Sequence, residues 1–170
     1  MNLRKYLLIP AILSLPLIFL SASVMAQGDF ARETLQGIPG VHVVVDMSLP
    51  SDLSAPGLSE QIQSDLEARL EMMGIDVLSR NKLEQTAQRP ILLARIDLVK
   101  PENAYVCFIL LQLYQQVHLT EKPQDRVYPA VTWSSDGVTG IFSALDSIRG
   151  VVLEELNQFV QDYQTAKQPE

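Results

Sequence analysis

The side chains of this sequence that could take part in chemistry are few and poorly placed to act together. The chain has two histidines, His42 and His118, and a single cysteine, Cys107. Nucleophilic catalysis needs a cysteine, serine or threonine within hydrogen-bond reach of a base. Cys107 and His118 occupy odd and even positions of one extended stretch, and such positions point to opposite faces of a strand. We therefore expect Cys107 to be a small buried hydrophobic residue.

Metal binding is not indicated by the spacing either. His42 and Asp46 share a strand face, but four residues of strand separate them by about 13 Å, too far for the two alone to hold one ion. A pair of His42 and His118 would need adjacent strands in register, which the sequence does not determine. Acidic pairs on the predicted helices are expected to face solvent, namely Glu67 with Glu71 and Glu154 with Glu155. We predict no catalytic residue, no metal ligand and no cofactor.

The segment 135–140, SDGVTG, places two glycines ahead of a predicted helix, and a helix N-terminus can hold an anion. No Walker-type lysine follows it and no G-x-G-x-x-G motif occurs, so we interpret the segment as a turn leading into the helix. Trp133, just before it, has two interpretations. It is either part of an aromatic contact surface or a core residue at the margin of a sheet.

Hydrophobic patterns predict the elements that hold these residues. A β-branched run predicts a strand over 41–49, and apolar residues at steps of three and four predict a helix from Leu58 to Met73. A short strand is expected over 75–79, and an antiparallel hairpin over 90–100 and 104–119. A further strand is expected over 126–135, at a sheet edge because it contains Pro129. A long helix is predicted by the apolar stripe Ile141, Leu145, Ile148, Val152, Leu156, Phe159 and Tyr163.

This order of elements predicts an α+β fold, a two-layer sandwich in which a mostly antiparallel sheet of about five strands is covered on one face by two amphipathic helices. The last stripe could instead form a dimeric coiled coil, but about three heptads in a small β-rich domain more often lie on a sheet. Without repeats or linkers, we expect one domain over 41–165, an N-terminal arm over 27–40 and a flexible tail over 166–170.

The stretch AYVCFILLQLYQQVHL, residues 104–119, defines a candidate surface. Its odd positions are apolar nearly throughout and belong beneath the helices, whereas its even positions change from apolar to polar after Leu110. A strand of roughly 50 Å is unusually long, so a bend or bulge is expected near residues 111–112. If nothing covers the apolar even positions, they form an exposed patch of the kind that marks interaction sites. The alternative is that the N-terminal arm, through Phe30, Leu35 and Ile38, or a neighbouring loop packs there.

The first 26 residues have the layout of a secretory signal peptide. Arg4 and Lys5 precede an apolar segment over 6–20, and small residues follow up to Ala26. The segment is short for a membrane anchor and is interrupted by prolines. Cleavage would leave 11 basic and 20 acidic residues, net charge −9, which opposes nucleic-acid binding. We expect a periplasmic or secreted bacterial protein that is not an integral membrane protein after cleavage and that has no intrachain disulfide.

Three segments, ETLQGIPGVHVVV, GLSEQIQSDLEARLEMMGIDVLS and VTWSSDGVTG, resemble an uncharacterised family of small exported bacterial proteins. The resemblance covers nearly all of residues 33–165. It implies an exported, compact α+β domain and brings no assigned activity, cofactor or catalytic residue. More distantly, the strand–helix–strand start and the later hairpin are similar to the N-terminal domain of the periplasmic Tol–Pal β-propeller protein and to small periplasmic activator domains. This second resemblance implies binding to partner proteins.

We therefore expect an exported, non-catalytic domain that binds a partner protein in the bacterial envelope, or a second copy of itself, through its open sheet face or an edge. The alternatives are a carrier of a small apolar or amphipathic ligand, which would need an enclosed cavity, and an enzyme of unknown type. The candidate interaction surface consists of Val106, Phe108, Leu110, Tyr114 and Trp133.

Overall fold

The computed structural model describes residues 30–101, 104–119 and 126–167, so the expected signal peptide lies outside the described residues. Five strands form one mixed sheet in the order β1-β2-β3-β4, with β5 also beside β3. Strand β1 (His42–Ser48) is parallel to β2 (Ile91–Val99), which is antiparallel to the long strand β3 (Tyr105–His118). The far edge of β3 pairs antiparallel with β4 (Val127–Ser134) and β5 (Val138–Phe142).

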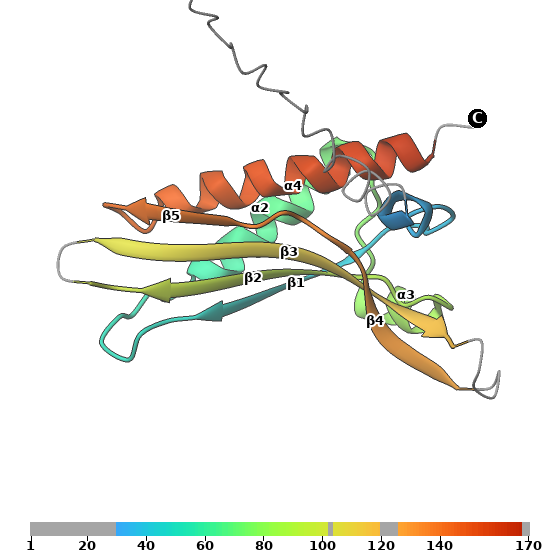
Figure 1. Ribbon diagram of the computed structural model, residues 1–170, viewed down its shortest axis with the longest axis horizontal. Coiled ribbons are helices and arrows are strands. Elements are labelled where there is room, and N and C mark those ends of the chain that lie inside the picture. The colour runs from blue at the N-terminus through green and yellow to red at the C-terminus, as the bar shows by residue number, and fades with distance from the viewer. Residues whose placement is uncertain (1–29, 102–103, 120–125, 168–170) are drawn as a thin grey trace, which may run out of the picture.

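Two long helices cover one face of this sheet. Helix α2 (Leu58–Met72) lies against β1, and α4 (Ser147–Ala166) lies against β3 and β5 and contacts α2. Figure 1 shows both helices on the same side of the strands, and the short helix α3 (Arg80–Gln85) follows α2 in the chain. The predicted α+β sandwich is therefore confirmed.

The core lies between the sheet and the two helices. The inward positions of β3 are fully buried, as their alternation with outward positions predicted: Cys107, Ile109, Leu111 and Leu113. The stripe of α4 meets them through Ile148, Val152, Leu156, Phe159 and Tyr163. The irregularity predicted near residues 111–112 of β3 is not found there, because β3 pairs with β2 without a break. A register shift occurs instead between Leu113 and Tyr114 in the pairing with β4, where Thr132 is the extra residue.

The predicted start of the last helix was wrong. Ile141 lies in β5, where it pairs with Val106, and α4 begins only at Ser147. Without β5 the first half of β3 would have unpaired backbone groups along this edge, and pairing them outweighs the helical pattern. The segment 135–140, interpreted as a turn before the helix, instead consists of the connection between β4 and β5 (residues 135–137) and the first three residues of β5. In this connection, the Ser135 hydroxyl accepts hydrogen bonds from the N–H groups of Leu111 (3.1 Å) and Gly137 (3.3 Å).

The segment predicted as a strand over 75–79 forms only an isolated bridge between Val41 and Val77. Val41 donates its N–H to the carbonyl of Asp76 (2.9 Å), and Leu78 donates to the carbonyl of Val41 (2.8 Å). Gly40 makes this approach possible, because a Cβ at that position would lie 2.2 Å from the Asp76 carbonyl oxygen. Pairing ends there because the chain turns into α3 at Arg80.

The N-terminal arm packs on the helix side of the sheet. Leu35 and Ile38 belong to the core, and the hydroxyl of Tyr163 in α4 donates a hydrogen bond to the carbonyl of Ile38 (3.2 Å). The arm lies near the C-terminal end of α4 in Figure 1. Packing of Leu35 and Ile38 over the even positions of β3, the alternative raised above, is therefore wrong, and the core begins before residue 41.

Candidate functional site

The face of the sheet that points away from α2 and α4, called here the reverse face, is defined by strand register. Outward positions of neighbouring strands fall into rows, such as His42, Ile91 and Tyr114, or Asp97, Phe108 and Thr139. The central strands contribute Ile91, Leu93, Arg95, Asp97 and Val99 from β2, and Val106, Phe108, Leu110, Gln112, Tyr114 and Gln116 from β3. The outer strands add His42, Val44, Asp46 and Ser48 from β1, and Val127, Pro129, Val131, Thr139 and Ile141 from β4 and β5.

Four of the five predicted surface residues lie on the reverse face. Val106, Phe108, Leu110 and Tyr114 all take outward positions of β3, and Phe108 is 39% exposed. The prediction for Trp133 was wrong, because it pairs with the inward residue Leu113 and is only 2% exposed. Its indole ring packs edge-to-face on Phe159 with ring centres 5.1 Å apart.

Exposed apolar side chains concentrate on this face. Of the eight large hydrophobic residues that are exposed within the described segments, five belong to the reverse face: Val99, Phe108, Val127, Val131 and Ile141. Val99, Val106, Phe108 and Ile141 form one cluster where β2 ends and β3 begins, because Val99 pairs with Val106 and Val106 with Ile141. Tyr114, Val127 and Val131 lie toward the opposite end of β3.

Charged side chains of β1 and β2 lie beside these apolar residues. Arg95 Nε lies 3.9 Å from Asp46 Oδ2, and both side chains are largely exposed, so this ion pair contributes little to stability. Asp97 lies one outward position further along β2. The reverse face therefore mixes apolar and charged side chains as protein interfaces do.

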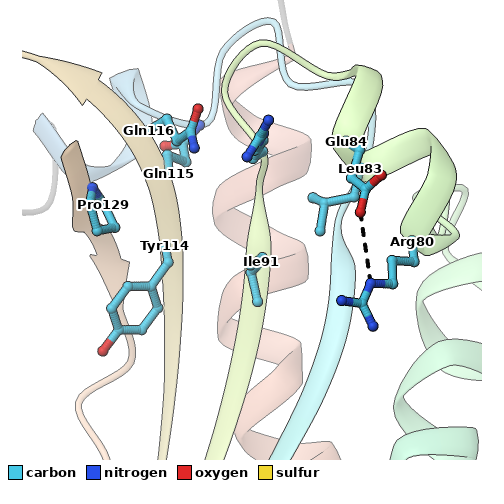
Figure 2. Close-up of a pocket in the computed structure, with 9 residues that line it drawn as sticks. Arg80, Leu83, Glu84, Ile91, Tyr114, Gln115, Gln116 and Pro129 are labelled. Carbon is cyan, nitrogen blue, oxygen red and sulfur yellow. Dashed lines mark ion pairs between the residues drawn. The ribbon is translucent and has the colours of Figure 1, made fainter. Parts of the chain in front are cut away.

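A pocket of about 280 Å³ opens on the reverse face beside α3. Figure 2 shows Ile91 and Tyr114 on adjacent strands, with α3 on one side of them, Pro129 on the other and α4 behind the sheet. Nine residues line the pocket, namely Arg80, Leu83, Glu84, Arg89, Ile91, Tyr114, Gln115, Gln116 and Pro129. Sequence reasoning missed it because its walls come from α3 and β4, which are distant in the chain. Only Tyr114 had been singled out.

The cations of this pocket differ in their pairing. Arg80 Nε lies 3.8 Å from Glu84 Oε1, and both side chains are mostly exposed. Arg89 has no ion-pair partner among the described residues. Its backbone φ is 43°, and no other non-glycine residue in the described segments has a positive φ. The turn that holds it is closed by Arg89 N–H donating to Thr86 O (3.1 Å), and the Gln88 carbonyl accepts from Gln116 N–H (2.7 Å).

The side chains considered for chemistry are not brought together. The Nδ1 atom of His42 lies 2.8 Å from the Leu78 carbonyl oxygen, whereas His118 pairs with Val127, and β2 separates their strands. Burial, with a smaller contribution from the charge of Asp97, raises the pKa of the Cys107 thiol to about 11, so this thiol stays protonated at neutral pH. In the segments that the structure describes, no group of three or more His, Cys, Asp or Glu side chains could hold a metal ion.

No helix within residues 30–101, 104–119 and 126–167 has the length and apolar character needed to cross a membrane. No family model and no curated protein matches the chain. Among solved structures, the chain is similar to a dodecamer of a PelC variant from Paraburkholderia phytofirmans, with 21% identity and a TM-score of 0.37 over 71% of this chain and 91% of that one. The family resemblance derived from the sequence motifs stays a prediction.

Proposed function

We propose that this chain is an exported, non-catalytic domain, periplasmic or secreted, that binds another protein of the bacterial envelope through its reverse face. The observation that supports this most directly is the concentration there of exposed apolar side chains, five of the eight in the described segments. Soluble monomeric proteins rarely expose grouped apolar residues without a binding role. Neither α2, α4 nor residues 35–40 cover this face.

The chemistry of the face favours a protein over the other classes of partner. Nucleic acid and anionic membrane surfaces attract basic proteins, whereas this chain has a net charge of −7. The outward side chains of Val99, Phe108 and Ile141 lie on a pleated sheet surface, which suits another folded surface better than an enclosed ligand. The charged side chains of Asp46, Arg95 and Asp97 beside them give such a partner polar contacts that fix its orientation.

The face is a better candidate than the edge formed by β4. Strand β4, at one edge, contains Pro129, which cannot donate a backbone hydrogen bond to an added strand.

Site-specific photo-cross-linking in cells of the native host tests the proposal. A photoreactive amino acid at Ile141, which is 76% exposed, samples the reverse face, and the same residue at Met72, 72% exposed on α2, is the matched control. We expect a discrete adduct with another protein from position 141 that Phe108→Asp abolishes, and no such adduct from position 72. Adducts that survive Phe108→Asp, that form equally from both positions, that contain only this chain, or that never form would contradict the proposal.

A further inference from the structure

The pocket beside α3 differs in chemistry from the rest of the reverse face. Its surface combines apolar groups from Leu83, Ile91 and Pro129 with the ring of Tyr114. Two guanidinium groups, of Arg80 and Arg89, line the same pocket against one carboxylate, that of Glu84. In a chain with a net charge of −7, this pocket carries one excess positive charge.

Arg89 is the residue of this set that the fold does not explain. Its positive φ of 43° is energetically costly for a side chain with a Cβ, and glycine or asparagine would meet the same turn at a lower cost. Its guanidinium has no ion pair with any described residue, whereas Arg80 has Glu84 within 3.8 Å. A strained residue with an unpaired charge at the rim of a pocket points to a role in binding.

The size of the pocket limits what it can hold. Pockets that enclose a whole small ligand usually measure roughly 300–1,000 Å³, and this one measures about 280 Å³ and is open along the reverse face. An open pocket at the lower end of this range has room for one large apolar side chain together with a charged group. Guanidinium groups bind carboxylates through two parallel hydrogen bonds, which makes a carboxylate the expected charged group.

We infer, building on the proposed function, that this pocket receives the carboxyl terminus of the partner protein, with the last apolar side chain on Ile91 and Tyr114 and the terminal carboxylate on Arg89. A chain terminus carries a carboxylate next to the Cα that bears an apolar side chain, and Arg89, Ile91 and Tyr114 line one pocket. Arg80 stays balanced by Glu84, so one carboxylate neutralises the remaining charge.

Titrations of the ¹⁵N-labelled domain followed by NMR test this inference. The probes are the peptide acetyl-Gly-Ser-Gly-Phe with a free carboxylate, the same peptide as its C-terminal amide, and 3-phenylpropionate. We expect saturable shifts of the Leu83, Ile91 and Tyr114 amides with the free carboxylate, and binding at least about 10-fold weaker for the amide, because a charge-assisted hydrogen bond is lost. Equal binding of peptide and amide, or no shifts at millimolar concentrations, would overturn the inference.

Variants separate a binding role of Arg89 from a structural one. Arg89→Gly relieves the backbone strain, so we expect an unchanged or higher thermal midpoint together with an affinity at least about 10-fold lower. Arg89→Gln keeps the strain and removes only the charge, and it should weaken binding equally. Arg95→Gln, on the reverse face but outside the pocket, is the control and should bind like the wild type. Unchanged affinity in both Arg89 variants would overturn the inference.

Further outcomes show whether the inference about the pocket or the proposed function has failed. If 3-phenylpropionate binds as tightly as the peptide, the pocket serves free amphipathic acids and the assignment to a chain terminus is overturned. If the peptide does not bind while the Ile141 adduct still forms and Phe108→Asp abolishes it, the inference about the pocket fails and the proposed function stands. If that adduct is absent, the proposed function itself fails.

Discussion

The indole nitrogen of Trp133 lies 2.9 Å from Oδ2 of Asp162, so a hydrogen bond joins strand β4 to helix α4 beneath the sheet. The other carboxylate oxygen of Asp162 accepts from Nε of Arg32, also at 2.9 Å, which ties the N-terminal arm to the same point. One aspartate thus connects three parts of the chain. A buried indole needs a partner for its N–H group, and Asp162 meets that need on the helix side rather than at the exposed surface.

Removal of the Asp162 carboxylate is expected to destabilise the fold. Asp162→Ala leaves the buried indole N–H without an acceptor, which should lower the free energy of unfolding by about 1–3 kcal/mol. Asp162→Asn keeps one acceptor oxygen and should lower the free energy of unfolding by a smaller amount. Trp133 is the only tryptophan, so its fluorescence during urea denaturation reports the change. Glu154→Ala, at an exposed position of the same helix, is the control and should stay within about 0.5 kcal/mol of the wild type. Equal stability of Asp162→Ala and the control would contradict the assigned role.

Substitutions on opposite faces of the sheet should lower the free energy of unfolding by different amounts. Ile109→Ala removes a fully buried side chain from the middle of β3 and is expected to lower the free energy of unfolding by about 2–5 kcal/mol. Ile141→Ser, 76% exposed on the reverse face, should change it by about 0.5 kcal/mol or less. Chemical denaturation of the two variants measures the difference, and a large loss from Ile141→Ser would show that this face is covered in the isolated domain.

The alternation of side chains along β3 was enough to predict which of its residues are buried. Hydrophobic residues two apart must share a face, and that rule placed Cys107, Ile109 and Leu111 inside and Phe108 and Leu110 outside. The α4 stripe was likewise readable from Ile148 onward, because helical spacing is a local property. The fold class followed from these local patterns.

Long-range pairing accounts for what the sequence did not predict. Ile141 fits a helical stripe, yet the free edge of β3 recruits it into β5. Trp133 is equally compatible with a surface or a core, and only its pairing with Leu113 and its bond to Asp162 decide the matter. The pocket also could not be predicted, since it depends on where α3 lies relative to Pro129.

Two glycine-to-alanine substitutions should have opposite effects. Gly40→Ala would place a Cβ 2.2 Å from the Asp76 carbonyl oxygen, so the bridge between Val41 and Val77 must open, and we expect a loss of several kcal/mol. Gly150→Ala lies in α4 with nothing within 4 Å of the added carbon, and it should stabilise the domain by about 0.5–1 kcal/mol. Thermal unfolding followed by circular dichroism compares both with the wild type. A stable Gly40→Ala variant would contradict the close approach.

The Cys107 thiol should be unreactive in the folded protein. Burial raises its pKa to about 11, so at pH 8 little thiolate forms and iodoacetamide should modify it only after unfolding. Mass spectrometry of samples alkylated with and without urea measures this. Rapid alkylation of the folded protein would contradict the burial.

The same pKa predicts a loss of stability at alkaline pH. The pKa of the thiol is higher in the folded protein than its unfolded value of 9.0. Its contribution to the free energy of unfolding is therefore fully present below pH 9 and is lost as the pH rises toward 11. The loss is at most about 3 kcal/mol. Cys107→Ala has no thiol to titrate and is the control, so the difference in unfolding free energy between it and the wild type should change across this range. A difference that stays constant from pH 8 to 11 would contradict the raised pKa.

Strands β4 and β5 pair with the same edge of β3, but each has its own register, and the connection that starts at Ser135 lies between them. Strand β4 pairs with the second half of β3, and β5 pairs with the first half. Ser135 is fixed to Leu111 of β3 through its backbone N–H (2.9 Å) and its hydroxyl, so we expect a residue inserted in β4 to leave the register of β5 unchanged. Mutations can consequently remodel the end that holds Ile141 without altering the end that holds Val131. Such a division allows related chains to change their recognition specificity piecemeal during evolution, one end of the contact region at a time.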